Sequence, residues 1–341
     1  MLSPAAMTSL FNLSAALANV QTANIQGHLA DIRAAAGDVV PIHSVNVSAG
    51  SGKETKAPRR KVVTLADEER WGFFMTGSGE FIHIGSATNG AGINLDSGGV
   101  TAGVDYRFTD HFAAGISLGY MNTNASLPNS GSVDVHGGRI GAYATWFNGG
   151  LHFDAAVTGG FNSYFTRRGT PNNTAASASP EGSEVSFLFS GGRDWTWKSL
   201  TIGPTASVQY TNTHLDGFTE RGPFAPLRVQ AQDSESLHST LGIRASVEKK
   251  IGRRSIRPEV RVAWQHEYGD VNHSLTSSFA TLGGTPFTVT GPATGRDSLL
   301  LGAGFTVQWN DRFATYAYYD GELARTNYRS NSVSVGFRYQ F

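Results

Sequence analysis

Two short segments carry the residue types of an enzyme, and each lacks something that the chemistry needs. Residues 115–119, GISLG, fit the G-x-S-x-G pattern of serine hydrolases, with Ser117 as the nucleophile. That nucleophile acts from a sharp turn between a strand and a helix. Ser117 instead lies within an alternating stretch that predicts a strand. We interpret the segment as small inward-facing residues beside a helix.

The second segment, GSGK at residues 50–53, is similar to a phosphate-binding loop. The first required glycine would fall at Val47, and Glu54 stands where the pattern needs Ser or Thr. His266 and Glu267 likewise lack the second histidine of a metalloprotease helix, and a strand would point them to opposite faces. We therefore predict no metal site and no cofactor.

One enzymatic alternative stays open. His214 and Asp216 fall in one long predicted loop, and His266, Glu267 and Asp270 fall near another. Acidic residues and histidines at a loop rim could together form a hydrolase site. Polar residues are common in such loops, so the favoured prediction is a chain without catalytic residues.

The composition narrows the class of protein. The 341 residues include 41 glycines and no cysteine, and only 16% are charged, against about 25% in an average soluble domain. The formal net charge is zero, so the sequence predicts no nucleic-acid partner. No apolar run reaches the roughly 18 residues of a spanning helix, and residues 2–17 lack the features of a signal peptide. We expect the export signal to lie outside this sequence.

The N-terminal region predicts one helix. Apolar residues recur near helical spacing over residues 8–36, and Gly37 and Pro41 provide a stop. Residues 38–69 are rich in Gly, Ser, Lys and Arg and predict a linker. The expected organisation is a helix within residues 1–37, which would thread the pore of the barrel described next, a linker over 38–69 and a second domain, the barrel itself, over 70–341.

From Trp71 onward the periodicity changes to two, which predicts strands. Along residues 256–268 the apolar row Val260, Val262 and Trp264 alternates with charged residues, which cannot lie unpaired in a dry core. They can line a wet lumen, because a membrane barrel is apolar outside and polar inside and satisfies every backbone group by closure. Twelve strands are predicted, near Trp71, Val100, Ala113, Val135, Phe153, Phe187, Ile202, Ile243, Val260, Leu301, Tyr316 and Val335.

Short and long connections alternate between these strands. Tight turns are predicted at residues 109–111, 148–150, 198–199, 252–254 and 310–312, and the other connections are mostly longer and polar. This alternation is typical of the periplasmic and extracellular rims of an outer-membrane barrel. The predicted fold is all-β: a twelve-stranded antiparallel transmembrane barrel surrounded by outer-membrane lipid.

The N-terminal helix is expected inside this barrel. A helix of about 28 residues rises about 42 Å, enough for a bilayer of roughly 40–45 Å. The alternative is a helix on the periplasmic rim. In the lumen its polar side chains would meet charged residues of the strands. The helix residues are Asn24, Gln26, His28, Asp31 and Arg33, and the lumen residues are Asp105, Arg107, Arg244, Glu248, Arg257, Glu259, Arg261 and Glu267.

Several segments resemble the autotransporter β-domain of type V secretion. They are GGVTAGVDYRF at residues 98–108, AWQHEYGD at 263–270, DSLLLGAGF at 297–305 and the C-terminal segment that ends in Phe341. The resemblance covers residues 71–341. It implies an outer-membrane domain of a Gram-negative bacterium that carries its own N-terminal passenger to the cell surface, after which the helix occupies the pore.

The resemblance also implies partners. A terminal strand with Phe337, Tyr339 and Phe341 is similar to the signal that the barrel-assembly machinery recognises, and periplasmic chaperones would precede that step. Self-cleaving members carry adjacent asparagines in the helix, but Ala23 precedes Asn24 here, so Asn24 receives no catalytic role. A diffusion porin, with residues 270–296 folded into the lumen, is the main alternative function.

Overall fold

The computed structural model describes residues 8–36, 40–41, 70–86, 92–127, 131–252, 254–281 and 284–341. The linker predicted over residues 38–69 lies outside this part of the chain, apart from β1 (Val40–Pro41), and so does the GSGK segment. Among the described residues, no helix is both long enough and apolar enough to cross a membrane.

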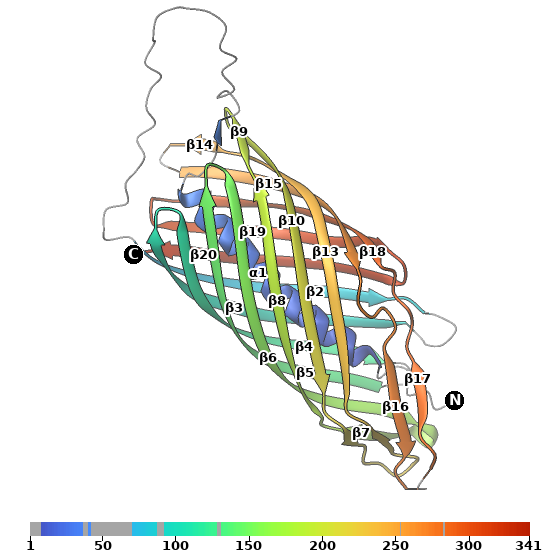
Figure 1. Ribbon diagram of the computed structural model, residues 1–341. Coiled ribbons are helices and arrows are strands. Elements are labelled where there is room, and N and C mark those ends of the chain that lie inside the picture. The colour runs from blue at the N-terminus through green and yellow to red at the C-terminus, as the bar shows by residue number, and fades with distance from the viewer. Residues whose placement is uncertain are drawn as a thin grey trace, which may run out of the picture.

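Twelve antiparallel strands close into a barrel around α1 (Ser9–Ala36), as Figure 1 shows. Neighbours in the chain pair with one another, and β20 pairs with β2 to close the sheet. The barrel strands are β2 (Trp71–Ile84), β3 (Ile93–Thr109), β4 (Phe112–Leu127), β5 (Gly131–Asn148), β6 (Leu151–Thr170), β8 (Glu181–Arg193), β10 (Leu200–Leu215), β13 (Gln232–Val247), β15 (Arg254–Glu267), β18 (Asp297–Gln308), β19 (Phe313–Arg325) and β20 (Tyr328–Gln340). The predicted fold class, with the helix in the lumen, is confirmed.

Shorter elements complete the two rims. The short-turn rim carries β9 (Trp195–Trp197), which pairs with β1 and β10, and β14 (Lys249–Ile251), which pairs with β15. On the long-loop rim, β7 (Thr174–Ala178) pairs with β6 and follows the 3-10 turn η3 (Pro171–Asn173). A separate four-stranded sheet on this rim contains β11 (Phe218–Thr219), β12 (Leu227–Val229), β16 (Ser274–Phe279) and β17 (Phe287–Thr290).

Side chains alternate between the outside and the lumen because successive residues of a strand point to opposite faces. Ile116 and Leu118 of β4 are 64% and 65% exposed on the outside, whereas Ser117 between them is 1% exposed on the inside. Aromatic rings gather on the outside near the short-turn rim, where the Trp71 and Tyr106 rings lie 5.0 Å apart. Such rings suit the interface between lipid and water.

The tight turns fall where the sequence predicts them. At the turn between β5 and β6, Gly149 and Gly150 have φ angles of 58° and 82°. A residue with a Cβ atom is strained in that left-handed region, and glycine is not. The turn between β13 and β15 contains Gly252 with a φ of 62°. These turns keep consecutive strands antiparallel neighbours and so determine the order of the barrel.

The lumen is less polar than the sequence pattern suggests. At the long-loop end, inward-facing apolar residues such as Ile82, Leu95 and Val135 form one cluster with Leu227 of β12 and Leu275 of β16. The sequence pattern predicts that every apolar row faces lipid, and at this end that prediction is wrong. The separate four-stranded sheet of this rim, called the outer sheet below, packs on these inward side chains and buries them without lipid.

Candidate functional site

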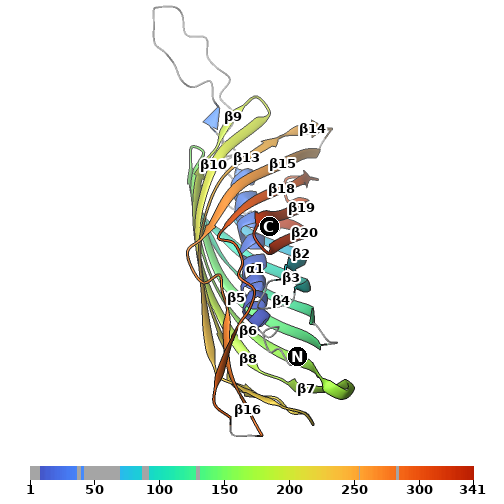
Figure 2. The same ribbon diagram turned by 90° about the vertical axis from the view of Figure 1, so that its right-hand side faces the viewer.

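The contact between α1 and the barrel wall is the candidate functional site. The helix runs through the lumen, as Figure 2 shows, and lies against β6, β10, β3, β5 and β8. Its apolar residues Ile25, Leu29 and Ile32 pack on Phe74 and Leu188, which face inward from β2 and β8. This apolar patch holds the helix against one wall. The sequence pattern does not predict it.

His28 is the central polar contact of this interface. Its Nε2 lies 2.6 Å from Oδ2 of Asp105 on β3, and both side chains are buried. The imidazole stacks on the Phe74 ring at a centroid distance of 3.9 Å. The Tyr143 hydroxyl donates to the same Asp105 oxygen at 3.4 Å. Asp105 therefore accepts two hydrogen bonds inside an otherwise apolar contact, which stabilises a buried carboxylate.

Arg33 makes the second buried contact. Its Nη1 forms an ion pair with Oδ1 of Asp154 on β6 and donates to Oγ1 of Thr145 on β5 at 3.3 Å. The other Asp154 oxygen accepts a hydrogen bond from Ser190 at 3.2 Å. A buried guanidinium is costly without a partner, so this pair favours one depth of the helix in the lumen.

Three arginines of the wall contact the last turns of α1. Arg257 of β15 donates from Nη2 to Oδ1 of Asp31 at 2.9 Å, and Arg338 of β20 donates to the Asp31 carbonyl oxygen. Arg107 of β3 donates to the Ile32 carbonyl oxygen at 3.4 Å. Positive groups near the C-terminal end of a helix interact favourably with its dipole.

Uncharged contacts continue toward the N-terminal half of the helix. Asn24 donates from Nδ2 to Oγ1 of Thr101 at 3.1 Å and to Oγ of Ser78 at 3.4 Å. Nε2 of Gln209 on β10 donates to Oδ1 of Asn19 at 2.7 Å. These bonds place Asn24 as a structural contact of the helix with β2 and β3.

Some of the predicted lumen residues have their described ion pairs within the wall and not with the helix. Arg244 pairs with Asp194, and Arg261 pairs with Asp320 at 2.9 Å, both within the wall. Glu259 lies 3.8 Å from Nε of Arg261, and it lines a cavity beside the helix together with Gln26.

Two more of the predicted lumen residues lie at opposite rims. Glu248 lines a second cavity at the short-turn rim. Glu267 accepts hydrogen bonds from Ser236 and from the backbone of Leu237 and Gly269 at the other rim. Neither glutamate has a hydrogen bond or ion pair to the helix among the described contacts.

Several wall residues that contact the helix were not predicted from the sequence, among them Asp154, Arg338 and Phe74. Asp154 and Arg338 sit in alternating strands with a polar row, so the same pattern that singled out Asp105 could have included them. Phe74 carries no such signal, because an inward aromatic residue and a lipid-facing one look alike in a sequence.

The residues considered above as candidates for catalysis have surroundings that do not suit that role. Ser117 is buried in the middle of β4 with no sharp turn beside it. His214 has Asp233 at 2.7 Å from Nδ1 and Asp216 at 3.3 Å from Nε2, so a carboxylate faces each ring nitrogen. Among the described residues, no group of three or more His, Cys, Asp or Glu side chains could hold a metal ion.

The terminal aromatic residues face the outside of the barrel. The Phe337 ring lies 5.9 Å from Phe73, and Tyr339 stacks on Phe341 at 6.1 Å. Backbone bonds of 2.9 and 3.1 Å join Phe341 to Trp71, where the last strand meets the first. Tyr339 and Phe341 are exposed at this seam, and Phe337 is half-buried beside them.

A closed, apolar-belted barrel with a helix bonded inside it defines a class, the outer-membrane β-barrels whose pore is filled by their own chain. The family model described as "Autotransporter beta-domain" matches residues 73–320. The chain belongs to the autotransporter β-domain family. It is a translocator domain of the outer membrane of a Gram-negative bacterium.

Solved structures share this fold. The translocator domain of the autotransporter NalP from Neisseria meningitidis superposes with a TM-score of 0.65 at 15% identity, covering 80% of this chain and 89% of that one. The β-domain of the Bordetella autotransporter BrkA superposes with a TM-score of 0.63 at 21% identity, covering 80% and 100%. Both likenesses bear on the fold.

A curated relative shows that such barrels belong to longer proteins. An extracellular serine protease of Serratia marcescens is 27% identical over 268 residues, which are 77% of this chain. The chain spans about a quarter of the length of that relative.

Proposed function

We propose that this barrel carries a passenger segment, N-terminal to α1, across the outer membrane, and that α1 then stays in the lumen and anchors the passenger. The observation that carries the proposal is the register of three buried contacts, those of His28, Asp31 and Arg33 with the wall. Sliding the helix by one turn, about 5.4 Å, would separate all three at once. The interface therefore favours a single stopping point.

The direction of the helix supports the proposal. Thr8, just before α1, packs against Gly291 at the long-loop end of the barrel, whereas Arg33 lies beside Asp154, which is three residues from the start of β6 at the short-turn end. In outer-membrane barrels the long loops face the cell exterior. A segment that precedes α1 would therefore lie outside the cell.

A topology assay tests this proposal. A small epitope is placed before residue 8 of the chain, expressed behind an export signal, and probed with antibody and protease on intact cells. We expect the epitope to be accessible. The matched controls carry it at residues 198–199, where it should stay protected, and at residues 281–284, where it should be accessible. A protected N-terminal epitope together with an accessible loop epitope would refute the proposal.

The contents of the lumen support a diffusion porin less well than a translocator. Residues 274–279 and 287–290 form β16 and β17 of the outer sheet, and α1 occupies the lumen. An ordinary porin should admit small sugars into proteoliposomes. We expect sugar-driven swelling near the level of protein-free vesicles, and rapid swelling would favour the porin.

We infer further that the chain works without catalysis of its own. The His214 ring has a carboxylate at each nitrogen, so neither nitrogen is free to take a proton from a nucleophile. Peptide and ester substrates should be turned over no faster by the native chain than by His214→Ala and His266→Ala. Loss of a measurable activity in either variant would reverse this inference.

The partners in assembly are part of the proposal. The outward-facing aromatic row at the end of β20, with Phe337, Tyr339 and Phe341, would suit recognition by the barrel-assembly machinery after delivery by periplasmic chaperones. We expect Phe341→Ala to lower the fraction of folded, heat-modifiable barrel in cells. The purified variant should still refold in detergent, which separates recognition from intrinsic stability.

A further inference from the structure

The helix does not fill the lumen evenly. Its hydrogen bonds and ion pairs to β15 and β20 all involve Asp31, whereas contacts with β2, β3, β5, β6 and β10 extend along its length. Between α1 and the strands β13 to β20 lies a cavity of about 350 Å³. A cavity needs only about 10–15 Å³ of such volume to hold one water molecule, so this one has room for several.

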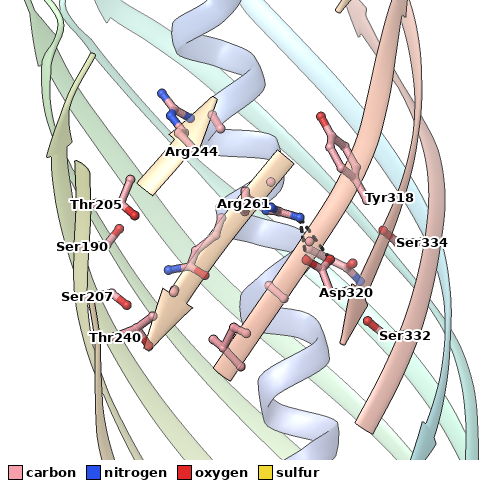
Figure 3. A pocket seen from close by; sticks show the side chains of 18 of the residues that line it. Ser190, Thr205, Ser207, Thr240, Arg244, Arg261, Tyr318, Asp320, Ser332 and Ser334 are labelled. Atoms are coloured by element: carbon pink, nitrogen blue, oxygen red, sulfur yellow. Dashed lines mark hydrogen bonds and ion pairs between the residues drawn. The ribbon is translucent and has the colours of Figure 1, made fainter. Parts of the chain in front are cut away.

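Small side chains line both sides of this cavity. The helix presents Ala23, Gly27 and Ala30 to it, and Figure 3 shows Ser332 and Ser334 on the opposite wall. Larger residues at these positions would fill the space and pack as a core does. The open side of the lumen therefore follows from the choice of residues on both elements.

Two further cavities lie toward the rims of the barrel. At the short-turn end a second cavity of about 310 Å³ is lined by Ala34, Glu248 and Gln340. On α1, Arg33 lines the central cavity and Ala34 lines the second one, and on β15 the change falls between Glu259 and Arg257. Toward the long loops a smaller cavity of about 50 Å³ shares Asn19 with the central one. Three cavities thus follow one another along the helix.

The central cavity carries more negative than positive groups. Its lining includes the carboxylates Glu80, Asp154, Glu259, Asp320 and Glu322, against the guanidinium groups of three arginines, Arg33, Arg244 and Arg261.

Glu80 stands out among these carboxylates. It is 7% exposed, and its Oε1 accepts a hydrogen bond from Ser330 at 2.6 Å, while Oε2 has no partner. A buried carboxylate oxygen without a donor is costly unless water or a cation reaches it.

We propose that these cavities form a narrow hydrated conduit beside α1 that conducts small cations across the plugged barrel. The inference rests on the proposed function only in that α1 remains in the lumen. Negative lining attracts cations and repels anions where the local dielectric constant is low. The plug then blocks polypeptides and sugars but leaves a path for ions.

Cysteine accessibility gives the first test, because the native chain has no cysteine. Ser334 lines the central cavity, whereas Ser117 of β4 is 1% exposed, so Ser334→Cys is compared with Ser117→Cys. In the folded barrel we expect small thiol reagents to label Ser334→Cys at least tenfold faster than Ser117→Cys. A cationic reagent should react several-fold faster than an anionic one of equal size. Equal protection of both cysteines, or faster anionic labelling, would overturn the proposal.

Conductance in planar bilayers gives the second test. Ser334→Phe places a ring in the conduit, whereas Val335→Phe places the same ring on the adjacent lipid-facing position, where valine is 54% exposed. We expect a small, cation-selective conductance that Ser334→Phe lowers by more than half and Val335→Phe leaves unchanged. Equal conductance of these two folded variants would contradict the conduit. Both tests use the folded chain without a passenger, so their failure leaves the topology assay untouched.

Discussion

At the scale of single residues, the interface combines charge with ring stacking. His28 meets the Asp105 carboxylate at one ring edge and the Phe74 ring on one face. The carboxylate also accepts from Tyr143. Removing Asp105 would therefore leave two buried donors without their acceptor, which is more damaging than losing one surface hydrogen bond.

Asp105→Ala is the first prediction. The free energy of unfolding should fall by about 1–3 kcal/mol, the usual cost of leaving a buried polar group unsatisfied. Asp96→Ala is the matched control, because Asp96 is an exposed aspartate on the same strand. Urea unfolding in lipid vesicles, followed by tryptophan fluorescence, measures both variants. Equal stability of the two would mean that His28 gains nothing from Asp105.

The ion pair of Arg33 and Asp154 gives the second prediction. Arg33→Met and Asp154→Ala should each destabilise the protein by about 3–5 kcal/mol, because each leaves a buried charge without its partner. The double variant should cost less than the sum of the two single variants. Strictly additive losses in the same unfolding assay would show that the two side chains do not stabilise one another.

At the scale of elements, inward aromatic rings lie against glycines of the neighbouring strand. The Tyr318 ring on β19 lies where a Cβ atom at Gly304 of β18 would stand, and Phe74 lies in the same way over Gly103. Such glycines allow a close approach of side chain to backbone. The pairing lets large rings fill the wall without pushing adjacent strands apart.

Gly304→Val is the third prediction. The added side chain would meet the Tyr318 ring and force it to move, and overpacking of this kind costs about 1–3 kcal/mol. Gly98→Val is the control, because a Cβ atom at Gly98 meets nothing within 4 Å. Both variants are heated to rising temperatures, and the temperature at which half of the folded, heat-modifiable band is lost on a gel is compared. A midpoint for Gly304→Val at or above that of the control would contradict the packing argument.

At the scale of the whole molecule, the outer sheet is held closed against the inner face of the barrel strands at the long-loop end. Leu227, Val229 and Leu275 of this sheet pack on inward residues of the barrel strands. His273, just before β16, hydrogen-bonds Ser234 through Nδ1 at 3.1 Å. Burial lowers the pKa of His273 to about 4, and Arg325 acts in the same direction, while Asp270 and Glu267 oppose it.

The fourth prediction is a pH dependence of this closure. An opened loop would bind a proton at His273 near pH 6.5, whereas the closed form resists protonation down to about pH 4. The stability of the closed sheet is therefore full above about pH 6.5 and declines as the pH falls toward 4. Proteolysis of residues 268–296 should be faster at pH 5 than at pH 7.5, and His273→Gln should flatten that difference. Faster cleavage at the higher pH would contradict the assignment.

The sequence by itself determined the barrel. Strand alternation and turn residues such as Gly149 and Gly252 act locally, and lipid on one side and water on the other force one side-chain period on every strand. Twelve strands and a lumenal helix could therefore be predicted, and so could Asp105, Arg107 and Arg257 as polar groups facing inward.

Only the tertiary structure decided which of those groups meet the helix. Arg244 and Arg261 pair within the wall, while Asp154 and Arg338 contact α1. The stagger of the closed strands and the rotation of the helix set these partners, and both arise from contacts between residues far apart in the chain. The apolar cluster under the outer sheet has the same origin, because an inward Leu95 and a lipid-facing Leu118 differ only in what the folded chain places beside them.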